Sequence, residues 1–106
     1  MVNPWRGDVR LVVDGQPRVM RLTLGALAEL EAALGDGSLM DLVKRFETGG
    51  FSTRDVLALV VAGLRGGGWD VSTEALRHAE IEGGPMAAAR AAAECLGRAF
   101  ALPDAG

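Results

Sequence analysis

The sequence predicts an α+β, mostly helical fold, with an N-terminal β-hairpin followed by about five α-helices in one compact domain. Alternating apolar residues on both sides of an Asp-Gly turn indicate the hairpin. Repeated helix-start and helix-stop signals bracket apolar residues at helical spacing in the rest of the chain. With 106 residues, 49% of them hydrophobic, the chain can form one core and has little room for a second.

Residues 8–22 predict the hairpin, after a loose N-terminal segment at 1–7. Apolar residues alternate in 9–13 and again in 18–22, which is typical of strands with one buried face. Residues 14–17, Asp-Gly-Gln-Pro, predict a turn of four residues. An isolated hairpin is marginal in water, so we expect this one to pack on the helices.

The helical body is predicted to occupy residues 23–101, and its first two helices are amphipathic. Thr23 is the expected N-cap of the first helix and Gly35 its C-cap. The apolar residues of this helix are Leu24, Leu27, Leu30 and Leu34. Ser38 is the expected N-cap of the second helix, which ends at Gly49. Its apolar stripe is Leu39, Leu42, Val43 and Phe46.

The third helix has the clearest start signal. Ser52 is the expected N-cap, and Asp55 three residues later completes a short relative of the capping box. The helix body is apolar nearly all round. It is therefore predicted to be either the central buried helix or half of an interface.

The last part of the chain contains a glycine run and two predicted helices. Residues 66–68, Gly-Gly-Gly, are interpreted as a flexible connector or hinge. A short helix capped by Ser72 or Thr73 is expected to carry Leu76, Ala79 and Ile81. The last helix is predicted at 85–101, with a tail at 102–106. Its predicted packing seam is Met86, Ala89, Ala93, Leu96 and Phe100.

The composition excludes several kinds of site. The formal net charge of −3 argues against nucleic acid as a partner. One cysteine and one histidine exclude an internal disulfide and a zinc site of the usual ligand types within one chain. The longest apolar run, at 56–62, is much shorter than the roughly 20 residues that cross a bilayer. We expect a soluble, cytoplasmic protein with no cofactor.

His78 and Cys95 are the two candidates for chemistry. His78 has Glu74 and Glu82 four residues away on either side, an arrangement that suits either a general base or a solvated helix face. Cys95 lies among alanines and is interpreted as a small buried residue. Neither forms a catalytic constellation, so we expect a binding or assembly module and no enzyme.

Five blocks of sequence carry a family resemblance. They are Asp14-Gly15-Gln16-Pro17, RLTLGALAELE at 21–31, Phe51-Ser52-Thr53-Arg54-Asp55, GLRGGG at 63–68 and AEIEGGP at 79–85. In this order the blocks resemble the gene transfer agent family of small proteins from alphaproteobacteria and their prophages. That family is similar to phage tail assembly chaperones and has also been labelled a tail tube protein.

The resemblance implies a tail assembly chaperone that keeps the tape measure protein soluble, with the major tail protein as a further possible partner. It carries no catalytic residue. A chaperone needs accessible apolar surface, and we expect Phe51, Leu57, Val61, Leu64 and Trp69 to border it. Self-association through that face is an alternative. The competing functions are a structural tail component, such as a tube or tail-completion subunit, and a small enzyme using His78.

Overall fold

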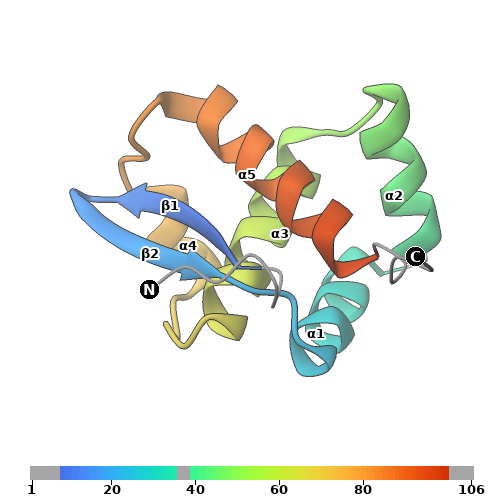
Figure 1. Cartoon of the computed structure of the whole chain (residues 1–106), viewed down its shortest axis with the longest axis horizontal. Coiled ribbons are helices and arrows are strands. Elements are labelled where there is room, and N and C mark those ends of the chain that lie inside the picture. The colour runs from blue at the N-terminus through green and yellow to red at the C-terminus, as the bar shows by residue number, and fades with distance from the viewer. Residues whose placement is uncertain (1–7, 36–38, 101–106) are drawn as a thin grey trace, which may run out of the picture.

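The computed structural model describes residues 8–35 and 39–100 of the chain (Figure 1). Its elements are β1 (Val9–Val13), β2 (Gln16–Met20), α1 (Leu24–Leu34), α2 (Leu39–Thr48), α3 (Thr53–Gly66), α4 (Thr73–Arg77) and α5 (Gly84–Ala99). The predicted hairpin followed by five helices is therefore confirmed. The predictions for 1–7, for the Ser38 cap and for 101–106 lie outside the described residues.

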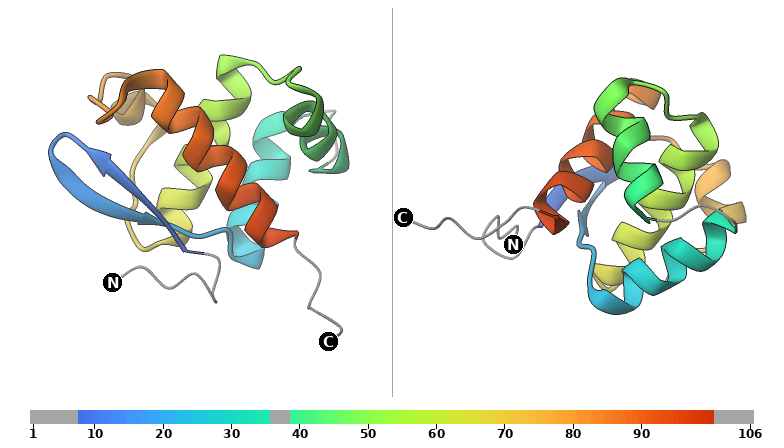
Figure 2. Two further views of the ribbon diagram at one scale, coloured as in Figure 1. Left: turned by 45° about the horizontal axis from the view of Figure 1, so that its top comes forward. Right: turned by 90° about the vertical axis from the view of Figure 1, so that its right-hand side faces the viewer.

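Helix α3 is the central element. It packs against β2, α1, α4 and α5, and α5 crosses it in the left view of Figure 2. Its buried residues include the continuous run from Leu59 to Leu64. An apolar helix needs neighbours over most of its surface, and here β2, α1, α4 and α5 supply them, while Leu57 and Ala58 are only half-buried. Of the two alternatives that the sequence left open, the central buried helix is confirmed.

The hairpin turn is shorter than predicted. Strand β2 already begins at Gln16, which pairs with Val13, so the loop consists of Asp14 and Gly15 alone. Both have positive φ, 50° and 77°, as a two-residue turn matching the twist of the strands requires. Pro17 is tolerated within β2 because a two-stranded sheet has only edge strands.

The tip of the hairpin is tied to the segment between α4 and α5. The Asp14 backbone N–H donates to the Glu80 carbonyl at 2.7 Å, and Asp14 Oδ1 accepts from the Glu80 N–H at 2.8 Å. Val13 and Ile81 form an isolated antiparallel bridge. The prediction of a helix carrying Ala79 and Ile81 is therefore wrong. α4 ends at Arg77 because the following residues extend to pair with β1.

The glycines at the end of α3 serve close packing. A Cβ at Gly66 would overlap the Arg21 carbonyl oxygen, and one at Gly67 would overlap the Val19 carbonyl oxygen. The Arg21 N–H also donates to the Gly63 carbonyl at 2.8 Å. The interpretation of 66–68 as a flexible connector or hinge is therefore wrong for Gly66 and Gly67, which let β2 and its extension lie directly on α3.

The predicted N-caps of α1, α3 and α4 are confirmed. Thr23 Oγ1 accepts from the Ala26 N–H at 3.1 Å, and Ser72 Oγ accepts from the Ala75 N–H at 3.0 Å. At α3 the capping box is complete: Ser52 Oγ accepts from the Asp55 N–H at 3.1 Å, and Asp55 Oδ2 accepts from the Ser52 N–H at 2.9 Å. Each cap fixes where its helix begins.

Helix α5 buries only part of the predicted seam: Leu96 is buried as predicted and Ala89 is half-buried. Its buried residues are Ala88, Ala91, Ala92, Cys95 and Leu96. Met86 is 71% exposed, and Ala93 and Phe100 are also exposed. An alanine-rich helix contains overlapping sets with spacings of 3 and 4. The helix face with mostly small buried side chains packs against β1 and α3, and these small side chains let α5 lie close to both elements. In α1, Leu24 likewise lies outside the core.

Candidate partner-binding site

Two neighbouring grooves flank the exposed part of α3. The larger has a volume of about 510 Å³ and lies between α3, α4 and the start of α5; we call it the apolar groove. Its lining residues are Phe51, Thr53, Val56, Leu57, Val60, Leu76, Arg77, Ala79, Ile81, Gly84, Pro85, Met86, Ala88 and Ala89. Arg77 is the one charged residue among them. Such a lining suits an apolar ligand surface.

Two lining residues of the apolar groove differ in character. The Phe51 ring stacks on Phe46, with ring centroids 4.6 Å apart and planes 7° apart, and this contact restricts the Phe51 ring. Met86 is 71% exposed, and its flexible thioether can adapt to different partners.

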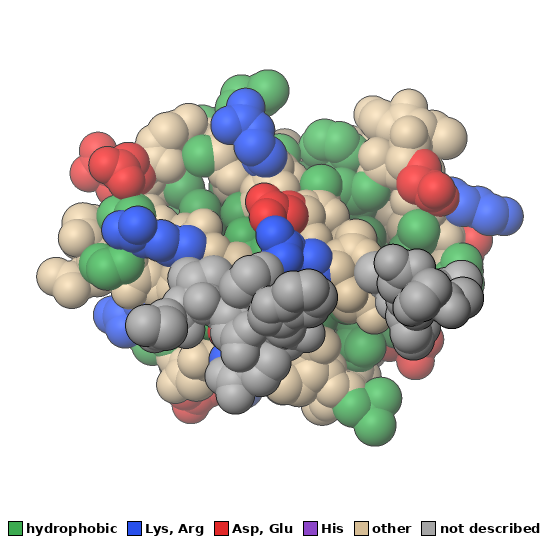
Figure 3. All heavy atoms as spheres, viewed as in Figure 1, with side chains coloured by type: hydrophobic (Ala, Val, Ile, Leu, Met, Phe, Trp, Pro, Cys, Tyr) green, Lys and Arg blue, Asp and Glu red, His purple; other side chains and the backbone are tan. Residues whose placement is uncertain are grey.

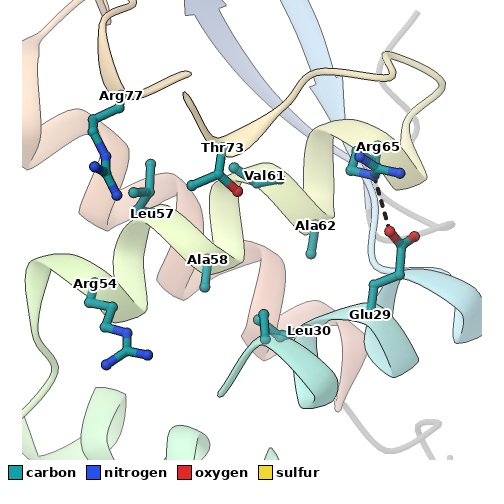
Figure 4. A pocket seen from close by; sticks show the side chains of 11 residues that line it. Glu29, Leu30, Arg54, Leu57, Ala58, Val61, Ala62, Arg65, Thr73 and Arg77 are labelled. Atoms are coloured by element: carbon teal, nitrogen blue, oxygen red, sulfur yellow. Dashed lines mark ion pairs between the residues drawn. The ribbon is translucent and has the colours of Figure 1, made fainter. Parts of the chain in front are cut away.

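The smaller groove, of about 340 Å³, lies over α3 between α1 and α4 (Figure 4). Its lining residues are Glu29, Leu30, Ala33, Arg54, Leu57, Ala58, Val61, Ala62, Arg65, Thr73 and Arg77. We call it the arginine groove. Leu57 and Arg77 line both grooves, so the two grooves are contiguous.

The predicted surface residues divide between these grooves and the interior. Phe51 and Leu57 line the apolar groove, while Leu57 and Val61 line the arginine groove. Leu64 is completely buried, so its prediction as a surface residue is wrong. Trp69 lines neither groove; its ring lies 4.0 Å from the Arg18 guanidinium carbon. Leu64 is buried because β2 covers the C-terminal end of α3.

The sequence analysis did not predict that residues of α4 and α5, and the arginines, line the two grooves. Met86 is predicted to belong to a packing seam, although it borders the apolar groove. Arg54 and Arg65 share one face of α3, since their separation corresponds to about three helical turns. The spacing of Arg54 and Arg65 could have been recognised in the sequence. Only the fold shows that a groove lies between these two arginines.

His78 and Cys95 lie outside both grooves. The His78 side chain is 74% exposed, and its Nε2 is 3.3 Å from Glu74 Oε1. Burial raises the pKa of the Cys95 thiol to about 11, so this thiol resists ionisation in the folded protein. Within 8–35 and 39–100, no group of three or more His, Cys, Asp or Glu side chains is placed to hold a metal ion.

The face shown in Figure 3 mixes hydrophobic side chains with charged ones of both signs. Among the described helices, none is long and apolar enough to cross a membrane. The apolar groove between helices is a form of surface that accommodates a segment of another protein.

A family model described as "Phage tail tube protein, GTA-gp10" matches residues 6–102, nearly the whole chain. The chain belongs to this family. The resemblance to gene transfer agent proteins inferred from the five sequence blocks is therefore confirmed, and this GTA-gp10 family member is a phage tail-related protein. Comparison with curated proteins and with solved structures gave no match.

Proposed function

We propose that this GTA-gp10 family protein is a tail assembly chaperone that binds the tape measure protein and keeps it soluble until the tail tube forms. The observation that carries the proposal is the apolar groove, a volume of about 510 Å³ with a single charged lining residue. An amphipathic helix buries its apolar face in such a groove. In this proposal the protein acts in the cytoplasm, by binding alone, without a catalytic residue or cofactor.

The size of the described sheet also supports a chaperone. A subunit that builds a tube by strand pairing needs long strand edges. Here the described sheet has two strands of five residues each, and one edge is partly used by the bridge between Val13 and Ile81. The alternative function is a structural tail component, which the family description as a tube protein favours.

Coexpression with the tape measure protein tests the proposed role. We expect Met86→Glu to reduce the soluble fraction of the tape measure protein, because it places a charge at the rim of the apolar groove. Met86 is 71% exposed, so the fold should tolerate the change. The matched control is Met40→Glu, at a 57% exposed methionine of α2 that lines neither groove.

The control should solubilise the tape measure protein as the wild type does. Equal solubility with both variants would exclude the apolar groove as the binding site. If the tape measure protein is equally soluble without this chain, the chaperone role is wrong. Mass spectrometry of purified particles then separates the alternatives: a chaperone is absent from the finished particle, and a structural component is abundant in it.

A further inference from the structure

The arginine groove has an apolar floor with arginines at both ends. Leu57, Ala58, Val61 and Ala62 line it from α3; Leu57 and Ala58 are half-buried, whereas Val61 and Ala62 are buried and form the bottom of the groove. Arg54 and Arg77 lie at one end of the groove and Arg65 at the other (Figure 4). On a helix, positions 54 and 65 are about 16 Å apart along the axis. This length matches about three turns of a helix lying alongside α3.

The charges that line this groove are unbalanced. Three arginines line it, against one carboxylate, Glu29, whose Oε1 lies 3.1 Å from Arg65 Nε. Arg54 forms no hydrogen bond or ion pair with any residue that the structure describes. The residues that line the groove thus carry an excess of positive charge, on a chain whose formal net charge is −3. A local charge that opposes the overall charge favours a partner of the opposite sign.

The other carboxylates near these arginines lie outside the groove. Asp70 Oδ1 is 3.2 Å from Arg65 Nη2, and Glu74 Oε2 is 4.0 Å from Arg77 Nη1. The side chains of Asp70 and Glu74 are 88% and 74% exposed. Exposed pairs of this kind are weak, so these arginines can exchange partners when a ligand carboxylate arrives.

We propose that the arginine groove binds an amphipathic helix of another protein whose apolar stripe is flanked by Asp or Glu side chains. The alanine-rich floor buries the stripe, and the arginines take the carboxylates, which their planar guanidinium groups bind with two parallel hydrogen bonds. The inference rests on the proposed function only for the identity of the partner. Because Leu57 and Arg77 line both grooves, the apolar floor of the arginine groove continues into the apolar groove.

The test uses three fluorescent model helices of about 18 residues, a length of roughly 27 Å, with the same leucine stripe. Their flanking positions carry Glu, Gln or Lys, and binding is followed by fluorescence anisotropy. We expect the Glu helix to bind about tenfold more tightly than the Lys helix at about 50 mM salt, and this preference to shrink at about 300 mM. The Gln helix should fall between them.

Charge reversal in the protein identifies the groove. Arg54→Glu combined with Arg77→Glu should reverse the preference, so that the Lys helix binds better. Arg10→Glu combined with Arg90→Glu is the matched control: it changes the net charge equally at exposed arginines that lie elsewhere, along a hollow bordered by β1 and α5. This control should retain the preference for the Glu helix.

Three results of the binding experiments would overturn the inference. They are no binding of the Glu helix, equal binding of the Glu and Lys helices, and the same loss in both double variants. A dimer of the chain that Arg54→Glu with Arg77→Glu disrupts would assign the groove to a second copy and would also overturn it. Selective binding of the Glu helix without any effect on tape measure solubility would keep this inference and reject the proposed function.

Discussion

Two buried aspartates form paired hydrogen bonds with arginines that lie far from them in the sequence. Asp8, 1% exposed, accepts from Arg21 Nε at 2.5 Å and from Arg21 Nη2 at 3.0 Å, which links the two ends of the hairpin. Asp55, 6% exposed, accepts from Arg45 Nε at 2.9 Å and Nη2 at 3.0 Å. The second pair joins α2 to the start of α3, so one carboxylate both caps a helix and holds its neighbour.

The pKa of Asp55 makes the stability of the protein depend on pH. Burial alone would raise this pKa, but the hydrogen bonds from Arg45 and Ser52 outweigh it and hold the pKa below its ordinary value of 3.8. The folded pKa is thus lower than the unfolded one. The resulting stabilisation is complete above the unfolded pKa and disappears as the pH falls through the folded pKa.

We therefore expect the free energy of unfolding to fall between about pH 5 and pH 3, and to fall less steeply in Asp55→Asn. Urea denaturation at a series of pH values measures both slopes. The amide of the variant does not ionise in this range, so its own contribution is independent of pH. Equal slopes for the variant and the wild type would show that Asp55 contributes nothing to the acid sensitivity.

At the scale of elements, the contact between the hairpin and α3 requires glycine. Gly67 is the C-cap of α3 with φ of −82°, a conformation open to any residue, so its requirement is for space. The backbone carbonyl of Val19 occupies the position of a Cβ. A methyl group here must therefore displace backbone, which costs more than shifting a flexible side chain.

We expect Gly67→Ala to destabilise the protein by roughly 3 kcal/mol. Gly97→Ala is the matched control, because Gly97 lies within α5, is exposed and has no neighbouring atom within 4 Å of the position that a Cβ would take. This control should stabilise the protein by about 0.5 to 1 kcal/mol, since alanine favours a helix. Thermal denaturation measures both changes. A neutral Gly67→Ala would indicate that residues 66–68 are a loose connector after all.

The elements that the sequence predicted well depend on local interactions. Thr23, Ser52 and Ser72 accept hydrogen bonds from backbone N–H groups three residues later, so the caps can be predicted without knowing the fold. The β-bridge of Ile81 could not be predicted in this way, because its partner Val13 is distant in the sequence. The buried face of α5 was ambiguous for a different reason: alanine occupies six of the seven positions from 87 to 93.

The candidate site could be predicted only in part, because grooves belong to the whole molecule. Phe51 and Leu57 were identified from their place on an apolar helix, and both line the apolar groove. The same reasoning selected Leu64, which β2 and the core enclose. Which apolar residues of α3 remain accessible depends on where α1, α4 and the hairpin pack. The helical period of α3 does not contain that information.

The whole molecule is organised around one hydrophobic core. Its buried members come from both strands, from every described helix and from the segment before α4; they include Met20, Leu30, Leu42, Leu59, Val71, Leu76 and Cys95. The hairpin contributes to this core and is anchored by Asp14 to Glu80. A domain of this size with a shared core unfolds cooperatively.

We therefore expect the Cys95 thiol to become reactive in the same urea transition that removes helical circular dichroism. In the folded protein Cys95 is 1% exposed and burial raises its thiol pKa to about 11, so a thiol reagent at about pH 8 should modify it only after unfolding. Cys95→Ser provides the background rate of the reagent. Because Cys95 lies where α5 packs on the rest of the core, modification before the loss of helix signal would mean that α5 detaches first. The apolar groove, which the start of α5 lines, would then form only after α5 has docked on the core.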